Sequence, residues 1–419
     1  MKLSRPRILI VSAVLPFPAV AGQRERVRNK LLALRESFET TFLTFAESSR
    51  RPGLRQELKE LCDHAVVMES LYTRSTASRW SHRVRAAGYA ALRSLKTSNY
   101  LVGELELSPQ RVLGAIDPQA YDLALFEYWH SHRAAAALRR RGVPSVLDMH
   151  NLLWQSFGRQ LEARPRLPSW LRRRKVTAYR RREEAAWGDF DGLISINAEE
   201  DTYVRRHCGP KQQVFYAPMG IDLGEWPFDP QPASPPRLAY FGGLGSVHNQ
   251  RDARSCYEKI MPLVWQQLPE AELWIVGSNP PAEIRNLEES DSRVHVTGFV
   301  EDAPPLLNTM SLVLCPWQGT YGFRSRLVQV MALGLPVIAS KDAVAGMDLR
   351  DGQGIFLESE PENQARRALE LLKDPMQRRQ QGELAHQQVA QRYSFEATYG
   401  RLTQELLQWQ KQRKGVWKS

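Results

Sequence analysis

The feature that most constrains the fold is an alternation of short apolar runs with longer helical patterns. Runs in the first half predict strands at Ile8–Val14, Thr40–Phe45, Ala65–Met68, Leu123–Phe126, Ser145–Leu147 and Gly192–Ile196. Runs in the second half predict strands at Arg237–Phe241, Glu272–Val276, Arg293–Val296, Leu312–Cys315, Pro336–Ala339 and Gly354–Leu357. Helical patterns lie between them, for example at Gln23–Leu34, Thr177–Trp187 and Arg251–Gln267. This alternation is typical of parallel sheets joined by crossover helices.

A proline-rich segment divides the predicted strands into two sets. It runs from Pro218 to Pro236 and reads as a linker. The chain has 419 residues, enough for two or three domains with cores of their own. We therefore predict an α/β fold of two Rossmann-like, doubly wound parallel-sheet domains that face a cleft. The predicted domains are residues 1–215 and 216–394, followed by a C-terminal helix at 395–419 that packs back on the first domain.

The N-terminal segment allows two interpretations. An apolar run from Ile8 to Leu15 precedes Ala19-Val20-Ala21-Gly22, as in a secretory signal peptide with a small-residue cleavage site. The alternative is a buried parallel strand that turns into a helix, and Pro16 and Pro18 favour it because they stand where a strand would end. No apolar run reaches the roughly 18 residues of a membrane span. The four cysteines lie far apart, which predicts free thiols in a reducing compartment.

The excess of positive over negative charge is confined to the first half of the chain. Residues 1–215 carry 36 Lys/Arg and 22 Asp/Glu, whereas residues 216–419 carry 21 and 24, so the net charges are +14 and −3. We expect the first half to meet an anionic partner. Basic residues are interleaved with Trp, Tyr and Leu at 74–100 and 159–182, a mixture that suits an anionic membrane surface. The alternative is a solvated face on helices that cover the core. No nucleic-acid recognition motif is present, so nucleic acid is not an expected partner.

The most informative stretch runs from Cys315 to Ser340. Its order is a strand, a glycine loop, a helix, a sharp stop and a second strand. The loop would present free backbone N–H groups at a helix N-terminus, which is an anion site. Arg324 and Arg326 add full charges suited to a diphosphate, and the Gln329 amide would reach a ribose. Further glycines follow other predicted strands, at Gly242, Gly243, Gly277 and Gly298.

These motifs, in this order, resemble family-four glycosyltransferases. The resemblance rests on Tyr240-Phe241-Gly242-Gly243, on His248-Asn249, on the runs Leu273–Gly277 and Val296–Asp302, and on Gly322–Ser340. Earlier landmarks are the loop from Pro16 to Arg24, Asp148–Asn151, Ile194-Ser195 and Pro218–Asp222. The resemblance implies two Rossmann-like domains in the GT-B arrangement and transfer of a sugar, with retention, from a nucleoside-diphosphate donor.

The resemblance also implies roles for individual residues. His150 would face the transferred sugar, and Arg324 and Arg326 would stabilise the leaving diphosphate, so these three are the candidate catalytic residues. Candidate donor-binding residues are Gly22, Gly242, Gly243, Asn249, Arg251, Gly277, Phe299, Val300, Tyr321, Gly322, Phe323 and Gln329. No Asp-x-Asp motif is present, and we predict a reaction without a metal or other cofactor.

The chain departs from the family pattern at two positions that matter. The family has a pair of glutamates where this chain has Tyr321 and Gln329. One branch of the family lacks the first glutamate and carries Gly-x-Arg-x-Lys, and the chain resembles it through Gly322, Arg324 and Arg326. An amide offers one acceptor oxygen, so exchanging the second glutamate for Gln329 would weaken donor binding by roughly 1.5–3 kcal/mol if nothing compensates.

We therefore expect a glycosyltransferase that uses a glycan or lipid-linked acceptor in cell-surface polysaccharide or glycoconjugate synthesis. Its expected location is cytoplasmic, on the inner face of the membrane. Two alternatives remain open on the same fold. One is a nucleotide-sugar epimerase, and the other is a catalytically impaired scaffold at a membrane surface.

Overall fold

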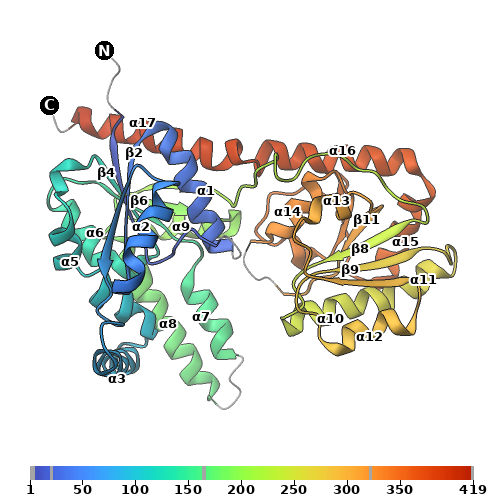
Figure 1. The fold of residues 1–419 in the computed structure, drawn as a ribbon, viewed down its shortest axis with the longest axis horizontal. Helices are drawn as coiled ribbons and strands as arrows, with labels where there is room; N and C mark the ends of the chain where they lie inside the picture. The colour runs from blue at the N-terminus through green and yellow to red at the C-terminus, as the bar shows by residue number, and fades with distance from the viewer. Residues whose placement is uncertain (1–4, 19–21, 163–166, 320–322, 417–419) are drawn as a thin grey trace. The chain divides into compact units, whose positions relative to one another are not determined.

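A computed structural model describes residues 5–18, 22–162, 167–319 and 323–416. The chain forms two compact units. The first unit comprises Met1–Pro218 with Tyr399–Ser419, and the second comprises Met219–Thr398. Each unit contains one parallel β-sheet with helices on its faces (Figure 1). The predicted class, two Rossmann-like parallel-sheet domains, is confirmed.

The first unit is built on a seven-stranded sheet in the order β3-β2-β1-β4-β5-β6-β7. Its strands are β1 Arg7–Val11, β2 Glu39–Ala46, β3 His64–Glu69, β4 Leu123–Glu127, β5 Ser145–Asp148, β6 Gly192–Ser195 and β7 Gln213–Tyr216. Its helices are α1 Gly22–Ser37, α2 Arg51–Lys59, α3 Thr76–Arg93, α4 Thr97–Asn99, α5 Pro109–Ala115, α6 His132–Arg139, α7 Leu153–Glu162, α8 Ser169–Trp187, α9 Ala198–His207 and α17 Arg401–Val416.

The N-terminal apolar run forms the central strand of this sheet. Residues Ile8–Val11 are fully buried in β1, which pairs in parallel with β2 on one side and β4 on the other. A strand covered on both faces favours continuous apolar residues, which is why the run lacks alternation. The strand interpretation of this segment is confirmed.

The edge strand β7 is absent from the sequence prediction. Only Val214 and Phe215 of its four residues are buried. A strand this short, with one neighbour, carries too little apolar periodicity to stand out from the loop around it. Arg205 and Arg401 donate hydrogen bonds to the carbonyl oxygens of Val214 and Tyr216, which covers part of the open edge.

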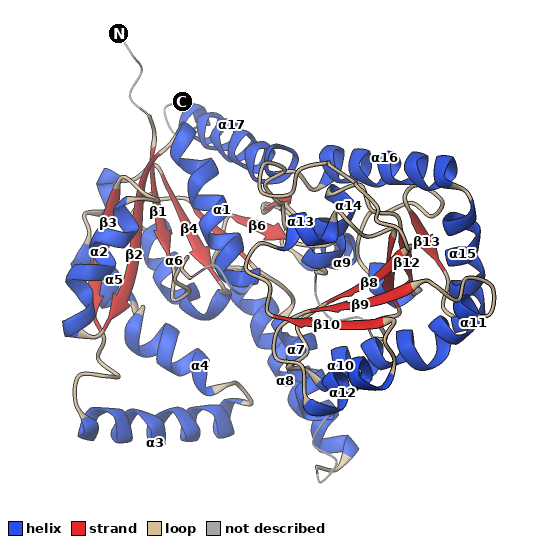
Figure 2. Cartoon of the chain, turned by 45° about the vertical axis from the view of Figure 1, so that its right-hand side comes forward, coloured by secondary structure: helices blue, strands red, loops and turns tan. Residues whose placement is uncertain are grey.

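The second unit is built on a six-stranded sheet in the order β10-β9-β8-β11-β12-β13 (Figure 2). Its strands are β8 Arg237–Phe241, β9 Glu272–Val276, β10 Val294–Gly298, β11 Leu312–Cys315, β12 Val337–Ala339 and β13 Ile355–Leu357. Its helices are α10 Val247–Ser255, α11 Met261–Trp265, α12 Ala282–Ser290, α13 Ala303–Leu307, α14 Ser325–Ala332, α15 Pro361–Lys373 and α16 Pro375–Arg392.

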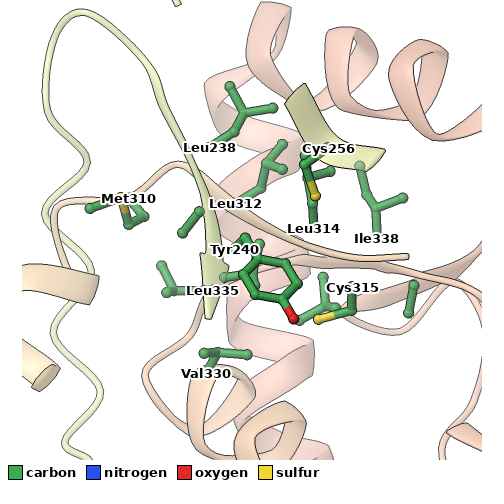
Figure 3. Close-up of a cluster of buried hydrophobic side chains, with 14 of the residues drawn as sticks. Leu238, Tyr240, Cys256, Met310, Leu312, Leu314, Cys315, Val330, Leu335 and Ile338 are labelled. Carbon is green, nitrogen blue, oxygen red and sulfur yellow. The ribbon is translucent and has the colours of Figure 1, made fainter. Parts of the chain in front are cut away.

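The core of the second unit packs its central strands against α14. Leu238 and Tyr240 of β8 pack against Leu312 and Leu314 of β11, with Val330 of α14 beneath them (Figure 3). These side chains are buried. Strand order runs outward from β8 through β9 and β10, and on the other side from β11 through β12 and β13. The switch in direction lies between β8 and β11, the place where open parallel sheets bind ligands.

The predicted helix at Arg251–Gln267 is interrupted. It divides into α10, a π-helical turn at Cys256–Ile260, and α11, which has Pro262 in its first turn. Proline has no N–H and cannot donate to the preceding turn, so the wider π-turn absorbs the missing hydrogen bond.

The C-terminal helix α17 belongs to the first unit. It contacts α1 and β7, and Figure 1 shows it beside α1. Leu402 and Leu406 are buried in the same apolar cluster as Ile8 and Ile10 of β1. Residues 5–416, apart from the gaps given above, contain no helix with the length and apolarity needed to cross a bilayer.

Candidate functional site

A pocket of ≈ 360 Å³ opens in the second unit where three neighbouring strands end. The carboxyl ends of β8, β9 and β10 supply its floor, and α14 supplies one wall. Its lining residues are Glu225, Trp226, Phe241, Gly242, Gly243, Val276, Gly277, Ser278, Phe299, Val300, Glu301, Asp302, Ala303, Pro304, Arg326 and Gln329. Seven of the predicted site residues therefore line one pocket: Gly242, Gly243, Gly277, Phe299, Val300, Arg326 and Gln329.

Glycines shape this pocket because two loops approach each other closely. A Cβ atom at Gly277 would lie 1.8 Å from the carbonyl oxygen of Gly242. Hydrogen bonds hold the loops together, from Gly242 N to Val276 O at 2.9 Å and from Leu244 N to Ser278 O at 2.7 Å. Only glycine fits at 277, so this residue serves the backbone architecture of the pocket as well as its lining.

Gly243 leaves room for the side chain of Arg326. A Cβ atom at position 243 would lie 3.2 Å from Arg326 Nη2 and 3.4 Å from Ser278 Oγ. The Arg326 guanidinium also lies 5.9 Å from the ring centroid of Phe241. The glycine loop and the arginine of α14 thus meet at one point of the pocket wall.

Arg326 brings a positive charge to a pocket whose lining also includes the carboxylates of Glu225, Glu301 and Asp302. Within the described part of the chain, no carboxylate forms an ion pair with it, and partial burial of the guanidinium lowers the pKa of Arg326. Arginine stays protonated even so. A cation held against a glycine loop without an acidic partner is suited to an anionic ligand such as a phosphate.

Nine lining residues of the pocket are not among the predicted site residues, and two of these nine are Glu225 and Trp226. Both lie in the segment interpreted as a linker, and Trp226 packs on Phe241 with 6.3 Å between ring centroids. The signal available was a tryptophan among prolines, which a plain linker does not need. Phe299 is 76% exposed at the pocket edge.

Two predicted donor-binding residues lie outside this pocket. Asn249 donates a hydrogen bond from Nδ2 to the carbonyl oxygen of Gly243 at 2.6 Å and so stabilises the glycine loop. Arg251 lines a separate pocket and pairs with Asp252 at 2.9 Å. The side chains of Asn249 and Arg251 are therefore held by contacts within the chain.

The predicted arginine and aromatic residues before α14 make contacts within the chain. Arg324 donates to the carbonyl oxygen of Gly319 at 2.9 Å and lies over the Trp317 ring at 5.2 Å, so it supports the loop. Phe323 packs on Tyr393, with ring centroids 5.7 Å apart, and contributes to the core. Tyr321 and Gly322 lie outside the described residues.

A buried charge cluster lies in the first unit where β4 and β5 end. Arg26 Nε lies 3.0 Å from Asp148 Oδ2, and Lys30 Nζ lies 2.7 Å from Glu127 Oε1. Lys30 also contacts Asp148. His150 completes the cluster, with Nε2 2.5 Å from Glu127 Oε2. Arg26 and Lys30 are one turn apart on α1, which places both cations over the ends of two adjacent strands.

The cluster stays ionised because its charges neutralise one another. Burial alone would raise the pKa of Asp148, but Arg26 and Lys30 outweigh it and hold that pKa far below its usual range. The pKa of Glu127 is lowered in the same way, against burial, by Lys30 and by the hydrogen bond from His150. Two buried cations and two buried carboxylates sum to zero charge.

His150 lies inside this cluster. The sequence prediction was that His150 faces the transferred sugar. Its side chain is 3% exposed, and the Tyr128 ring stacks on it with centroids 4.4 Å apart. Both residues have positive φ, +65° for Tyr128 and +57° for His150, a strained conformation for residues other than glycine. The His150 side chain is almost wholly covered in this structure. Gly22, the remaining predicted residue, begins α1 beside Gln23, which accepts a hydrogen bond from the Tyr128 hydroxyl at 3.0 Å.

Glu127, Asp148 and His150 are also close enough together to hold a metal ion. The Lys30 ammonium already contacts both carboxylates, so a cation would have to displace it. The donor set therefore fits an internal ion-pair network better than a metal, and metal independence stays a prediction.

Two family models cover most of the chain. Residues 21–220 match the glycosyl transferase 4-like domain, and residues 235–374 match the glycosyl transferases group 1 model. Together they place the chain among the GT4-type glycosyltransferases. The pocket of the second unit lies within the group 1 domain, and the buried charge cluster lies within the 4-like domain.

Solved structures with the same fold include several enzymes of sugar metabolism. Sucrose-phosphate synthase from Thermosynechococcus elongatus is 18% identical with a TM-score of 0.62, over 96% of this chain and 99% of that one. HepE from Anabaena, solved with UDP and glucose, is 15% identical with a TM-score of 0.59, over 96% and 100%. A Listeria monocytogenes protein described as a UDP-N-acetylglucosamine 2-epimerase is 13% identical with a TM-score of 0.53, over 95% of both chains. These confirm the GT-B fold of this glycosyltransferase. No curated protein sequence matches it.

Proposed function

We propose that this glycosyltransferase moves a sugar, with retention, from a nucleoside-diphosphate sugar to a glycan or lipid-linked acceptor. The observation that carries the proposal is the pocket at the ends of β8, β9 and β10, where Arg326 faces the Gly242-Gly243 loop. HepE binds UDP and UDP-glucose on the same fold, which favours a uridine nucleotide here. Cell-surface polysaccharide or glycoconjugate synthesis is the setting we propose.

The lining residues suit the parts of such a donor. The Arg326 guanidinium would bind the diphosphate and stabilise the charge that develops as it leaves. The Gln329 amide would hydrogen-bond a ribose hydroxyl, and Phe299 with Val300 would border the base. A donor bound there needs no metal in this proposal, because the arginine supplies the positive charge.

A panel of nucleotides tests the proposal at the level of binding. We expect one of UDP, GDP, ADP and dTDP to raise the melting temperature, because a ligand that binds only the folded state stabilises it by mass action. That nucleotide names the donor base. Transfer from the matching sugar, followed by assignment of the product anomer by NMR, then tests retention. Absence of any shift at millimolar nucleotide would favour the impaired scaffold instead.

Exchanging Gln329 for glutamate tests the ribose assignment. A carboxylate accepts from both ribose hydroxyls, so Q329E is expected to lower the Kd for the nucleoside diphosphate by about tenfold, one charge-assisted hydrogen bond. Isothermal titration calorimetry measures the change. The matched control is Gln266→Glu, because Gln266 is an exposed glutamine of the same unit that does not line the pocket. An unchanged Kd for Q329E would place the ribose elsewhere.

The epimerase alternative is favoured by one comparison, the Listeria protein of the same fold. The two functions differ in what they need, because an epimerase changes the donor sugar without an acceptor. Incubation with donor alone, followed by product analysis, separates them. Appearance of an epimerised sugar would overturn the transferase proposal.

A further inference from the structure

Helix α3 of the first unit presents an apolar face to solvent. Of its 18 residues only Ala86 is buried. Trp80, Val84 and Leu92 are 62%, 70% and 87% exposed, and their spacing of four and eight residues places them on one stripe. Gly88 continues the stripe between Val84 and Leu92. A helix normally turns such a stripe toward the core, so this helix is oriented the opposite way.

The arrangement of α3 explains why the stripe stays open. Helix α3 contacts α4 and the π-helical turn Tyr100–Glu106, and it lies away from the sheet (Figure 2). Its partners approach from the side of Ala86, opposite the stripe on a helical wheel. Arg83 lies over the Trp80 ring at 5.4 Å and donates to the Tyr72 hydroxyl at 2.9 Å, which holds a cation beside the exposed indole.

The charged residues of α3 and its flanking segments have one sign. Between Glu69 and Glu104 the sequence contains no carboxylate, and its basic residues are Arg74, Arg79, Arg83, Arg85, Arg93 and Lys96. Among the described residues, carboxylates from other segments contact α3 only through Arg79, which lies 3.9 Å from Glu47, and through the Tyr89 hydroxyl, which donates to Glu104. An apolar stripe on a helix whose own charged residues are all basic is complementary to a surface with an apolar interior and anionic headgroups. A protein partner of ordinary composition offers both signs of charge and does not select this pattern.

A second exposed tryptophan lies at the same end of the unit. Helix α3 follows β3 and helix α7 follows β5, so both leave the sheet at the carboxyl ends of its strands. Helix α8 pairs with α7, and Figures 1 and 2 show this pair extending from the sheet in the same direction as α3. Trp170 near the start of α8 is 59% exposed and is followed by Arg172-Arg173-Arg174-Lys175. Lys96, after α3, lies 5.7 Å over the ring of Phe157 in α7.

We propose that the exposed stripe of α3, Trp80, Val84 and Leu92, docks the protein on an anionic lipid bilayer, with Trp170 as a second insertion point. The arginines would bind the headgroups while the apolar side chains enter the boundary with the acyl chains. This inference goes beyond glycosyl transfer and does not depend on it. If the proposed function also holds, docking would bring the carboxyl ends of the first sheet, where Asp148 and His150 lie, toward the membrane that carries a lipid-linked acceptor.

Vesicle co-sedimentation of the full chain tests the docking. We expect binding to phosphatidylcholine vesicles containing about a third phosphatidylglycerol, weak binding to pure phosphatidylcholine, and release as salt shortens the Debye length. Replacing Trp80 and Leu92 with serine should reduce the partition coefficient at least about tenfold, and Arg85→Glu should reduce it several-fold. The matched controls are Met376→Ser and Arg285→Glu, exposed positions of the second unit, which should leave binding unchanged.

Each result decides the inference in one direction. No binding of the unaltered protein to anionic vesicles at low salt would overturn it, and so would equal binding by the Trp80/Leu92 double variant. Light scattering tests whether a second copy of the chain occupies the stripe instead. A dimer that becomes monomeric in the double variant would make the stripe a contact between two copies and would also overturn the inference. The nucleotide-induced melting shift, measured on the same variant, shows that the fold and the proposed donor site are intact. It therefore separates failure of docking from failure of the proposed function.

Discussion

Replacing Asp148 with asparagine is expected to lower the free energy of unfolding of the first unit by about 3–5 kcal/mol. Asp148 is fully buried and accepts hydrogen bonds from Arg26 Nε and Nη2, at 3.0 Å in both closest contacts. The asparagine keeps the shape but removes one negative charge. Arg26 and Lys30 would then share only Glu127, which leaves a buried positive charge without compensation. Urea unfolding followed by circular dichroism measures the loss.

A matched control separates burial from the chemistry of the substitution. Asp117→Asn changes an exposed carboxylate of the same unit and should alter stability by less than about 0.5 kcal/mol.

The pH dependence of the free energy of unfolding gives a second readout for D148N. The folded pKa of Asp148 is lowered, so its contribution is complete above the unfolded value of about 3.9 and is lost as pH falls below that value. The variant should therefore lose less stability on acidification than the unaltered protein. Equal stability of D148N at neutral pH would show that the cluster is not an obligatory ion-pair network.

Replacing Arg326 with methionine is expected to weaken nucleoside-diphosphate binding by about 10- to 100-fold. One charge-assisted hydrogen bond to a phosphate contributes roughly 1.5–3 kcal/mol, and tenfold in Kd corresponds to about 1.4 kcal/mol. Methionine retains the length and apolar stem that pack near Phe241, so the change removes mainly the charge. Calorimetric titration with the nucleotide identified in the panel measures the effect.

The control for Arg326 is Arg285→Met, which removes an exposed arginine of α12 in the same unit. The Kd of R285M should match that of the unaltered protein. The Kd of Arg326→Lys should lie between those of the unaltered protein and R326M, because lysine keeps the charge and loses the planar fork. Loss of affinity in both arginine-to-methionine variants would indicate a general effect of net charge. An unchanged Kd in R326M alone would remove the diphosphate from this pocket.

Part of the candidate site could be predicted because its requirements are local. Gly242, Gly243 and Gly277 follow apolar runs directly, and a strand that turns sharply at its end needs glycine whatever surrounds it. Arg326 and Gln329 are three residues apart in one helical pattern and therefore share a face. The structure places all five in one pocket. Four other predicted residues have the same kind of local signal, but their side chains contact other parts of the chain. The pairs are Asn249 with Gly243, Arg251 with Asp252, Arg324 with Gly319 and Phe323 with Tyr393.

By itself the sequence determined the two parallel sheets, the glycine turns at their strand ends and the excess of positive charge in the first half. These follow from periodicity and composition, which act over a few residues. Only the tertiary structure decided which charged side chains pair. Arg26 is 122 residues from Asp148 and meets it because β1, β4 and β5 are neighbours and α1 crosses their ends. Likewise only the packing of α3 on its inner side left Trp80 and Leu92 exposed, since an amphipathic pattern specifies that a helix has an apolar face and not which way that face turns.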